Sequence, residues 1–191
     1  MTDVVLFHHA QGLTPGVEAF AERLREAGYR VTVPDLFEGA TFDTVEEGVQ
    51  HAQQLGFDTV LDRGRAAVEN LPAALVYAGF SLGVMPAQLL TQTRPGARGC
   101  LMLSGCLPPT EFGTPWPDGV PVQVHGMEGD PWFAGEDLDA AHALVADVAE
   151  AELFVYPGEQ HLFTDDSLAS YVPEQAALVE RRVLDFLAAL D

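Results

Sequence analysis

Residues 74–93 read ALVYAGFSLGVMPAQLLTQT, and this stretch decides the fold. Its first part, Ala74–Ala78, is a fully apolar run that predicts a buried strand, and Leu82–Thr93 predicts the helix that follows. The turn between them has the pattern G-x-S-x-G, centred on Ser81. The two glycines let strand and helix approach each other, and a helix N-terminus directs backbone N–H groups toward developing negative charge. We therefore expect Ser81 to be a nucleophile, the alternative being a glycine-rich tight turn without chemistry.

Short apolar runs alternate with helical patterns along the rest of the chain. Further strands are predicted at Val4–Phe7, Arg30–Pro34, Gly99–Leu103, Val120–His125 and Glu152–Tyr156. Further helices are predicted from Pro15, with Thr14 as N-cap, to a stop at Gly28, once or twice within residues 40–70, at Asp137–Ala149 and at Pro173–Leu190. This alternation indicates an α/β fold with a mostly parallel sheet of about six to seven strands and helices on both faces. At 191 residues, we expect one domain spanning 1–191.

A serine hydroxyl is a weak nucleophile until a base takes its proton, and that base needs an acceptor to fix its tautomer. His161 follows the last predicted strand, and Asp130 lies in a Gly-Asp-Pro turn after the strand that ends at His125. Ligands bind at the carboxyl ends of parallel strands, so we expect Ser81, Asp130 and His161 to meet there. The backbone N–H groups of Leu82 and Ala10 are the expected oxyanion donors.

Other residues at the predicted strand ends allow further hypotheses. His8 or His9 with His125 and Asp130 could form a metal site, although no pair has helical or C-x-x-C spacing. No nucleotide-binding glycine motif occurs, and we expect neither a metal nor a cofactor. Trp116 is a further candidate for a wall of the site. Candidate substrate-binding residues are His9, Gln11, Trp132 and Phe133.

The charge balance limits the partners. Nine Lys plus Arg against 29 Asp plus Glu give a net charge of −20, which repels nucleic acid and anionic lipid surfaces. The uncharged stretch Asn70–Thr93 is interrupted by Gly and Pro and is read as a strand and a helix rather than a membrane span. Cys100 and Cys106 have no metal or redox spacing and are expected to be reduced thiols. With no signal-peptide pattern at the start, a cytoplasmic protein is expected.

The chain resembles the dienelactone hydrolase family of α/β-hydrolases nearly end to end. The resemblance rests on the opening strand with its Gln11-Gly12 loop, on Val33–Phe37, on the motif around Ser81, on His125–Asp130, and on Tyr156-Pro157-Gly158 with His161 and Phe163. The chain order nucleophile, acid, base is also that of α/β-hydrolases. The resemblance implies a minimal α/β-hydrolase fold without a large lid. It also implies hydrolysis of a small-molecule ester, lactone or thioester through an acyl-enzyme, with a homodimer as one option for assembly.

Two departures from the family concern the site. Family members typically carry Cys in G-x-C-x-G, whereas this chain has Ser81, and Cys106 lies on a different loop. The family's glutamate that holds the resting thiol falls at His9, and its arginine that grips the lactone carboxylate falls at Thr164 or Asp165. We therefore carry over the hydrolase chemistry without the dienelactone specificity, and expect Asp165 to repel a substrate carboxylate. A non-catalytic binding protein on the same fold is the alternative.

Overall fold

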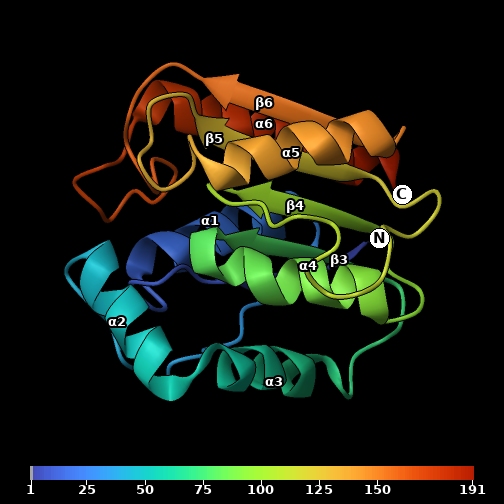
Figure 1. Cartoon of the computed structure of the whole chain (residues 1–191), viewed down its shortest axis with the longest axis horizontal. Helices are drawn as coiled ribbons and strands as arrows, with labels where there is room; N and C mark the ends of the chain where they lie inside the picture. Colours follow the sequence, from blue (N-terminus) through green and yellow to red (C-terminus); the bar gives the residue numbers. More distant parts are fainter. Residues whose placement is uncertain (1) are drawn as a thin grey trace.

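The computed structural model describes residues 2–191 and contains one sheet of six strands in the order β2-β1-β3-β4-β5-β6 (Figure 1). All neighbouring strands are parallel, which confirms the predicted fold class. The strands are β1 (Asp3–Phe7), β2 (Arg30–Thr32), β3 (Leu75–Phe80), β4 (Gly99–Leu103), β5 (Val122–Met127) and β6 (Ala151–Tyr156). The helices are α1 (Pro15–Glu26), α2 (Val45–Leu55), α3 (Phe57–Val68), the 3₁₀ turn η1 (Ser81–Gly83), α4 (Val84–Thr93), α5 (Glu136–Asp147) and α6 (Pro173–Ala189).

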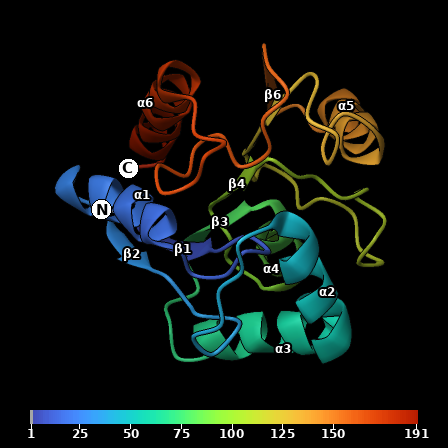
Figure 2. The same cartoon turned by 90° about the vertical axis from the view of Figure 1, so that its left-hand side faces the viewer.

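Helices cover both faces of the sheet. The apolar sides of α1 and α6 pack on one face, and α2, α3, α4 and α5 contribute to the core on the other (Figure 2). Every residue of β3, β4 and β5 is buried, as expected for parallel strands covered on both faces. Because all six strands are parallel, their carboxyl ends lie at the same end of the sheet, which is called the carboxyl edge below.

The predicted caps of α1 are confirmed. The Thr14 hydroxyl accepts the N–H of Val17, Pro15 takes the first helical position, and Gly28 adopts a left-handed φ of +102° just beyond the end. Strand β2 ends at Thr32, two residues earlier than expected. It is an edge strand, and Pro34 has no N–H to extend its pairing.

The helix after β3 begins differently from the prediction. A 3₁₀ turn over Ser81–Gly83 precedes α4, so Pro86 lies in the first turn of α4. There its missing N–H removes no intrahelical hydrogen bond, because the first N–H groups of a helix have no partner within it. No helix among the described residues is both long and apolar enough to cross a membrane.

His125 is not at a strand end, contrary to the prediction, because β5 continues to Met127. Its ring is fully buried, with Nδ1 at 2.9 Å from the Tyr156 hydroxyl and Nε2 at 3.2 Å from Gln123 Oε1. Burial and the nearby Arg182 lower the pKa of His125 to about 3. It therefore does not belong to the strand-end cluster that the metal hypothesis required. Within residues 2–191, no group of three or more His, Cys, Asp or Glu is arranged to hold a metal ion.

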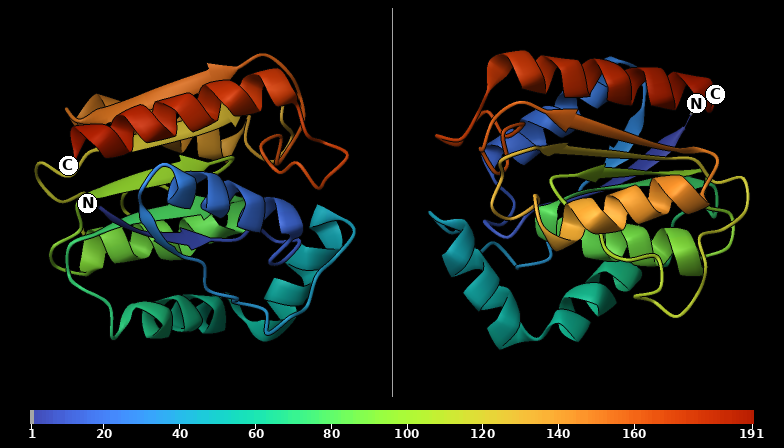
Figure 3. Two further views of the ribbon diagram at one scale, coloured as in Figure 1. Left: turned by 180° about the vertical axis from the view of Figure 1, so that it is seen from behind. Right: turned by 45° about the horizontal axis from the view of Figure 1, so that its top comes forward.

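The two ends of the described chain lie beside each other (Figure 3). The hydroxyl of Thr2 donates a 2.7 Å hydrogen bond to the Asp191 carboxylate. Both lie away from the carboxyl edge of the sheet, because Thr2 precedes β1 and Asp191 follows α6, which runs back from that edge.

Candidate active site

The turn between β3 and η1 is sharp and holds Ser81 in a left-handed conformation with φ of +48°. A Cβ on Gly79 would lie 2.1 Å from the carbonyl oxygen of Gly83, and a Cβ on Gly83 would lie 2.4 Å from that of Phe7. Both glycines are therefore required by close backbone contacts. A non-glycine residue at this φ costs roughly 1–2 kcal/mol, which the surrounding packing must offset. The strained backbone of Ser81 thus holds its hydroxyl at the tip of the turn that follows the carboxyl end of β3.

Three strand ends bring Ser81, His161 and Asp130 together. The Ser81 Oγ lies 2.8 Å from His161 Nε2, and His161 Nδ1 lies 2.6 Å from Asp130 Oδ2. The other oxygen of Asp130 accepts the N–H of Trp132 at 2.9 Å. Asp130 is fully buried and His161 is nearly so. The arrangement can take a proton from a serine hydroxyl and hold the resulting imidazolium against a buried carboxylate.

The turn after β5 explains why Asp130 rather than Glu128 faces His161. The N–H of Asp130 donates to the carbonyl of Met127, and the N–H of Gly129 donates to that of Gly158 in the loop after β6. This pairing joins the two loops and directs Asp130 inward, whereas Glu128 is exposed. The loop conformation therefore decides between two carboxylates only two positions apart.

The loop after β1 lies against the Ser81 turn, because a Cβ on Gly83 would also touch the carbonyl of His8. Ala10, in this loop, is fully buried, and its N–H donates no hydrogen bond to any residue in the described range. An unpaired buried N–H is costly and rare. Leu82 follows Ser81 in the first turn of η1, where N–H groups lack intrahelical partners. These two N–H groups, the expected oxyanion donors, belong to the two segments that meet at the Ser81 turn.

Neither cysteine is poised as a nucleophile. Cys106 is buried in the loop after β4, and burial together with the Asp137 carboxylate raises the pKa of its thiol. Burial raises the pKa of the Cys100 thiol, within β4, to about 12. Both thiols remain protonated near neutral pH, and a thiol is far less nucleophilic than a thiolate.

Asp137 is a residue that the sequence analysis missed. It lies in the first turn of α5, and its Oδ2 accepts the N–H of Cys106 at 3.0 Å. Burial, with Asp130 nearby, raises the pKa of Asp137. This hydrogen bond holds the loop after β4, in which a Cβ on Gly105 would lie 3.2 Å from the carbonyl oxygen of Ser81. An acidic residue in a first helical turn is too common to have indicated this role.

Of the candidate substrate-binding residues, only Trp132 lies exposed beside the site. It is 40% exposed, and its ring centroid is 6.0 Å from that of His161. Phe133 is fully buried and fills the space next to Gly126, so it is a core residue rather than a wall. Gln11 is buried and donates its side-chain amide to the carbonyls of Phe42 and Asp43. The side chains of Phe133 and Gln11 thus make their contacts within the protein and do not face the space around Ser81.

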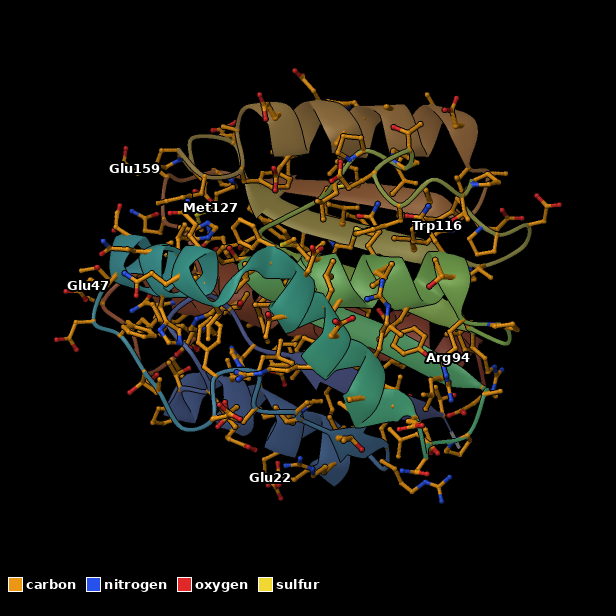
Figure 4. All side chains as sticks on the ribbon, turned by 60° about the horizontal axis from the view of Figure 1, so that its bottom comes forward. Glu22, Glu47, Arg94, Trp116, Met127 and Glu159 are labelled. Atoms are coloured by element: carbon orange, nitrogen blue, oxygen red, sulfur yellow. The ribbon has the colours of Figure 1, made fainter. Side chains whose placement is uncertain are left out.

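Trp116 is far from the site, contrary to the expectation. Its Nε1–H donates to the carbonyl of Val120, just before the amino end of β5. Figure 4 shows Trp116 and Arg94 at the end of the molecule opposite to Met127 and Glu159, which mark the carboxyl edge.

His9, Thr164 and Asp165 are also buried, so none faces a substrate. The expectation that Asp165 repels a substrate carboxylate is therefore wrong. Its carboxylate accepts a hydrogen bond from His9 at 2.8 Å. This pair occupies the positions where the resemblance placed a glutamate and an arginine.

A six-stranded parallel sheet with a strained serine turn after β3, a carboxylate after β5 and a histidine after β6 defines an α/β-hydrolase. The chain belongs to the dienelactone hydrolase family, whose model matches residues 1–190. It is therefore a hydrolase that acts on ester bonds.

Solved structures share the fold over nearly the whole chain. A dienelactone hydrolase-like promiscuous phosphotriesterase from metagenomic libraries is 18% identical with a TM-score of 0.79, covering 100% of this chain and 87% of that one. A putative dienelactone hydrolase from Klebsiella pneumoniae is 19% identical with a TM-score of 0.76, covering 98% and 87%. A dienelactone hydrolase from Anabaena variabilis is 19% identical with a TM-score of 0.67, covering 98% and 86%. A search of curated proteins found no match.

Proposed function

We propose that this chain is a serine hydrolase that cleaves a small carboxylic ester, lactone or thioester through an acyl-enzyme on Ser81. The observation that carries the proposal is the continuous hydrogen-bonded chain from Ser81 Oγ through His161 to Asp130, with distances of 2.8 and 2.6 Å. It forms on an ester-hydrolase fold whose cysteines are buried and protonated. Residues 1–191 act as one catalytic domain in this proposal.

The reaction follows from the positions of these groups. His161 Nε2 takes the proton of Ser81 Oγ as the oxygen attacks the substrate carbonyl carbon. The N–H groups of Ala10 and Leu82 stabilise the oxyanion of the tetrahedral intermediate. His161 then gives the proton to the leaving alcohol or thiol, which leaves the acyl group on Ser81.

Water resolves the acyl-enzyme by the same route in reverse. His161 takes a proton from the water as its oxygen attacks the acyl carbon, and then returns the proton to Ser81 Oγ as the acid departs. Asp130 accepts from Nδ1–H throughout, which keeps Nε2 free of hydrogen in the resting state.

Several features support a neutral substrate over an anionic one. The loops that surround Ser81 contain no Lys or Arg. Arg63, on α3, donates to the carbonyl of Leu36 and pairs with Glu38, so its charge is already engaged. Arg65 pairs with Asp62 on its own helix. Trp132 offers an apolar surface beside His161 instead.

Substitution of the nucleophile tests the proposal. Ser81→Ala removes one oxygen from a turn whose shape depends on Gly79 and Gly83, so the fold should persist. Turnover of p-nitrophenyl acetate should fall on the order of 10⁴-fold, with a residue of activity from the oxyanion donors. A fluorophosphonate should label wild type at Ser81 and leave Ser81→Ala unlabelled.

Cys106→Ser is the matched control, because it exchanges the other candidate nucleophile for a hydroxyl. It should keep most of the wild-type turnover. Retention of more than a tenth of the activity in Ser81→Ala would refute the serine mechanism. Absence of both turnover and labelling in the wild-type protein would favour a non-catalytic binding protein on this fold.

A further inference from the structure

A second buried histidine–carboxylate pair, besides His161 and Asp130, joins two loops at the carboxyl ends of the strands. His9, in the loop after β1, approaches Asp165, in the loop after β6, with 2.8 Å between Nε2 and Oδ2. Their side chains are 0% and 2% exposed. Residues 156 positions apart in the chain are thus paired out of contact with solvent. The proposed reaction steps do not use this pair.

Asp165 accepts hydrogen bonds from three further groups besides His9. The Thr14 hydroxyl donates to Oδ2, while the hydroxyl and N–H of Ser167 donate to Oδ1 at 2.6 and 2.9 Å. Burial raises the pKa of Asp165, but the hydrogen bonds from His9, Ser167 and Thr14 outweigh it and lower the pKa to about 2. Both carboxylate oxygens are saturated by the protein, so Asp165 can neither bind substrate nor carry protons.

The carboxylate also sits directly over the N-terminus of α1. A Cβ on Gly16 would lie 1.7 Å from Asp165 Oδ1, and the Ser167 hydroxyl accepts the N–H of Gly16 at 3.1 Å. The positive end of the helix dipole favours a negative charge there. Asp165 is therefore a fixed point, held by α1 and by its own loop.

His9 links Asp165 to the loop after β1, residues 8–14, which contains Ala10 and is called the oxyanion loop below. Its Nδ1 accepts the N–H of Gln11 at 3.2 Å, so the ring is the tautomer that donates from Nε2 to Asp165. Gln11 is itself held by the carbonyls of Phe42 and Asp43. Ala10, whose buried N–H is unpaired, lies between these two anchored residues. Its N–H direction is set by bonds on both sides.

Asp165 is also connected to His161, the proposed general base, through a short turn of the chain. Asp165 follows His161 by four positions, and its N–H donates to the carbonyl of Leu162 at 3.0 Å, which closes a turn. Leu162 adopts a left-handed φ of +57° within that turn. His161 and Asp165 are thus parts of one short, constrained segment. A route of covalent and hydrogen bonds runs from Ala10 through His9 and Asp165 to His161.

We propose that the His9–Asp165 pair is a positioning element that fixes the Ala10 N–H relative to His161, so that oxyanion donor and base are held as one unit. The inference rests on the proposed function, because it assigns a role within that reaction. Geometry matters at this scale: a displacement of about 1 Å in a catalytic group can cost on the order of 100-fold in rate.

The test compares two substitutions of His9 that differ in one donor. His9→Gln keeps an N–H that can reach Asp165, whereas His9→Met has similar length and no donor. Asp165→Asn perturbs the pair from the other side. For His9→Met and Asp165→Asn we expect kcat on p-nitrophenyl acetate to fall about 10- to 100-fold, with KM within about twofold of wild type. His9→Gln should recover most of the activity that His9→Met loses.

A second measurement isolates the oxyanion. A trifluoromethyl ketone adds to Ser81 and places a charged oxygen where the Ala10 N–H would bind it. Its inhibition constant should rise in His9→Met and Asp165→Asn by a factor similar to the fall in kcat. Fluorophosphonate labelling counts the folded, competent sites, so that loss of protein is not mistaken for loss of rate.

His125→Gln provides the control for removing a buried, hydrogen-bonded histidine whose side chain bonds to Tyr156 and Gln123 and has no part in the proposed reaction. It should lower thermal stability without changing kcat. Normal kcat and normal ketone affinity in either His9→Met or Asp165→Asn would overturn the proposal, as would a fall in kcat with unchanged ketone affinity. If one of these variants fails to fold, the other decides. Activity in Ser81→Ala would instead refute the proposed function itself, which keeps the two failures distinct.

Discussion

At the scale of single residues, two buried histidines, His8 and His125, depend on remaining neutral. The Nδ1 of His8 lies 2.8 Å from the carbonyl of His9, and its Nε2 accepts the N–H of Leu36 at 2.9 Å. Protonation of His8 would turn that acceptor into a donor facing a donor. Burial lowers the pKa of His8 to about 4, and burial with Arg182 lowers that of His125 to about 3.

These two pKa values predict loss of stability in mild acid. An unfolded histidine titrates near 6.5, so the unfolded chain binds protons that the folded chain refuses. The contribution of these two neutral histidines to the free energy of unfolding is complete above about pH 6.5. It is lost progressively as the pH falls toward 4 for His8 and toward 3 for His125. Urea unfolding at pH 7.5, 6 and 5 should show a falling free energy of unfolding, with a smaller slope in His125→Gln. A slope in His125→Gln as steep as that of wild type, or a flat wild-type profile, would contradict the prediction.

Residues that could be predicted from the sequence are those whose position is set by a strand end. Ser81, His161 and Asp130 each follow an apolar run, and parallel topology brings such residues together. Gln11 and Phe133 were assigned wrongly because no periodicity fixes the direction of a loop side chain. The contact between His9 and Asp165 has no local signature at all, and only the folded chain brings the two together.

At the scale of elements, α2 packs against the oxyanion loop through Gly48. A Cβ at this position would lie 1.9 Å from the carbonyl oxygen of Ala10, so helix and loop are in backbone contact. The sequence indicated only one or two surface helices within residues 40–70, because this segment is largely polar and acidic and α2 buries only the small residues Gly48 and Ala52. The close approach, which depends on a single missing side chain, could not be predicted from that pattern.

Gly48→Val should therefore impair the reaction more than the fold. The added side chain forces α2 away from Ala10 or displaces the loop, with a cost on the order of 1–3 kcal/mol in stability. We expect kcat on p-nitrophenyl acetate to fall at least about 10-fold. Glu46→Ala, at an exposed position of the same helix, is the control and should behave as wild type. A Gly48→Val protein with normal kcat would show that α2 does not support the loop.

At the scale of the whole molecule, the charge of −20 acts on any charged substrate. The nine cationic side chains are all arginines, and none lies on the loops around Ser81. Because like charges repel over roughly a Debye length, an anionic ester is disfavoured before it reaches the site.

This charge predicts a salt-dependent specificity. At low ionic strength, kcat/KM for a neutral ester should exceed that for a matched ester carrying a carboxylate, roughly 10-fold or more. Raising NaCl from 20 to 500 mM should narrow the gap by accelerating only the anionic substrate, because salt screens the repulsion. The neutral ester serves as the internal control. A wild-type preference for the anionic ester would show that a cation reaches the site.

The hydrogen bond between Thr2 and Asp191 places the two ends of the described chain next to each other, so a short linker can join them without moving any strand. A few glycine and serine residues would span the two ends, and new ends between Asp118 and Gly119 would fall in an exposed loop before β5. Such a circular permutant should form the same six-stranded sheet and keep its turnover of p-nitrophenyl acetate within a few-fold. In this permutant, Asp130 and His161 would precede Ser81 in the chain, so that acid and base come before the nucleophile. Activity of the permutant would show that proximity in space suffices for the reaction, whatever the order in which the three residues are synthesised.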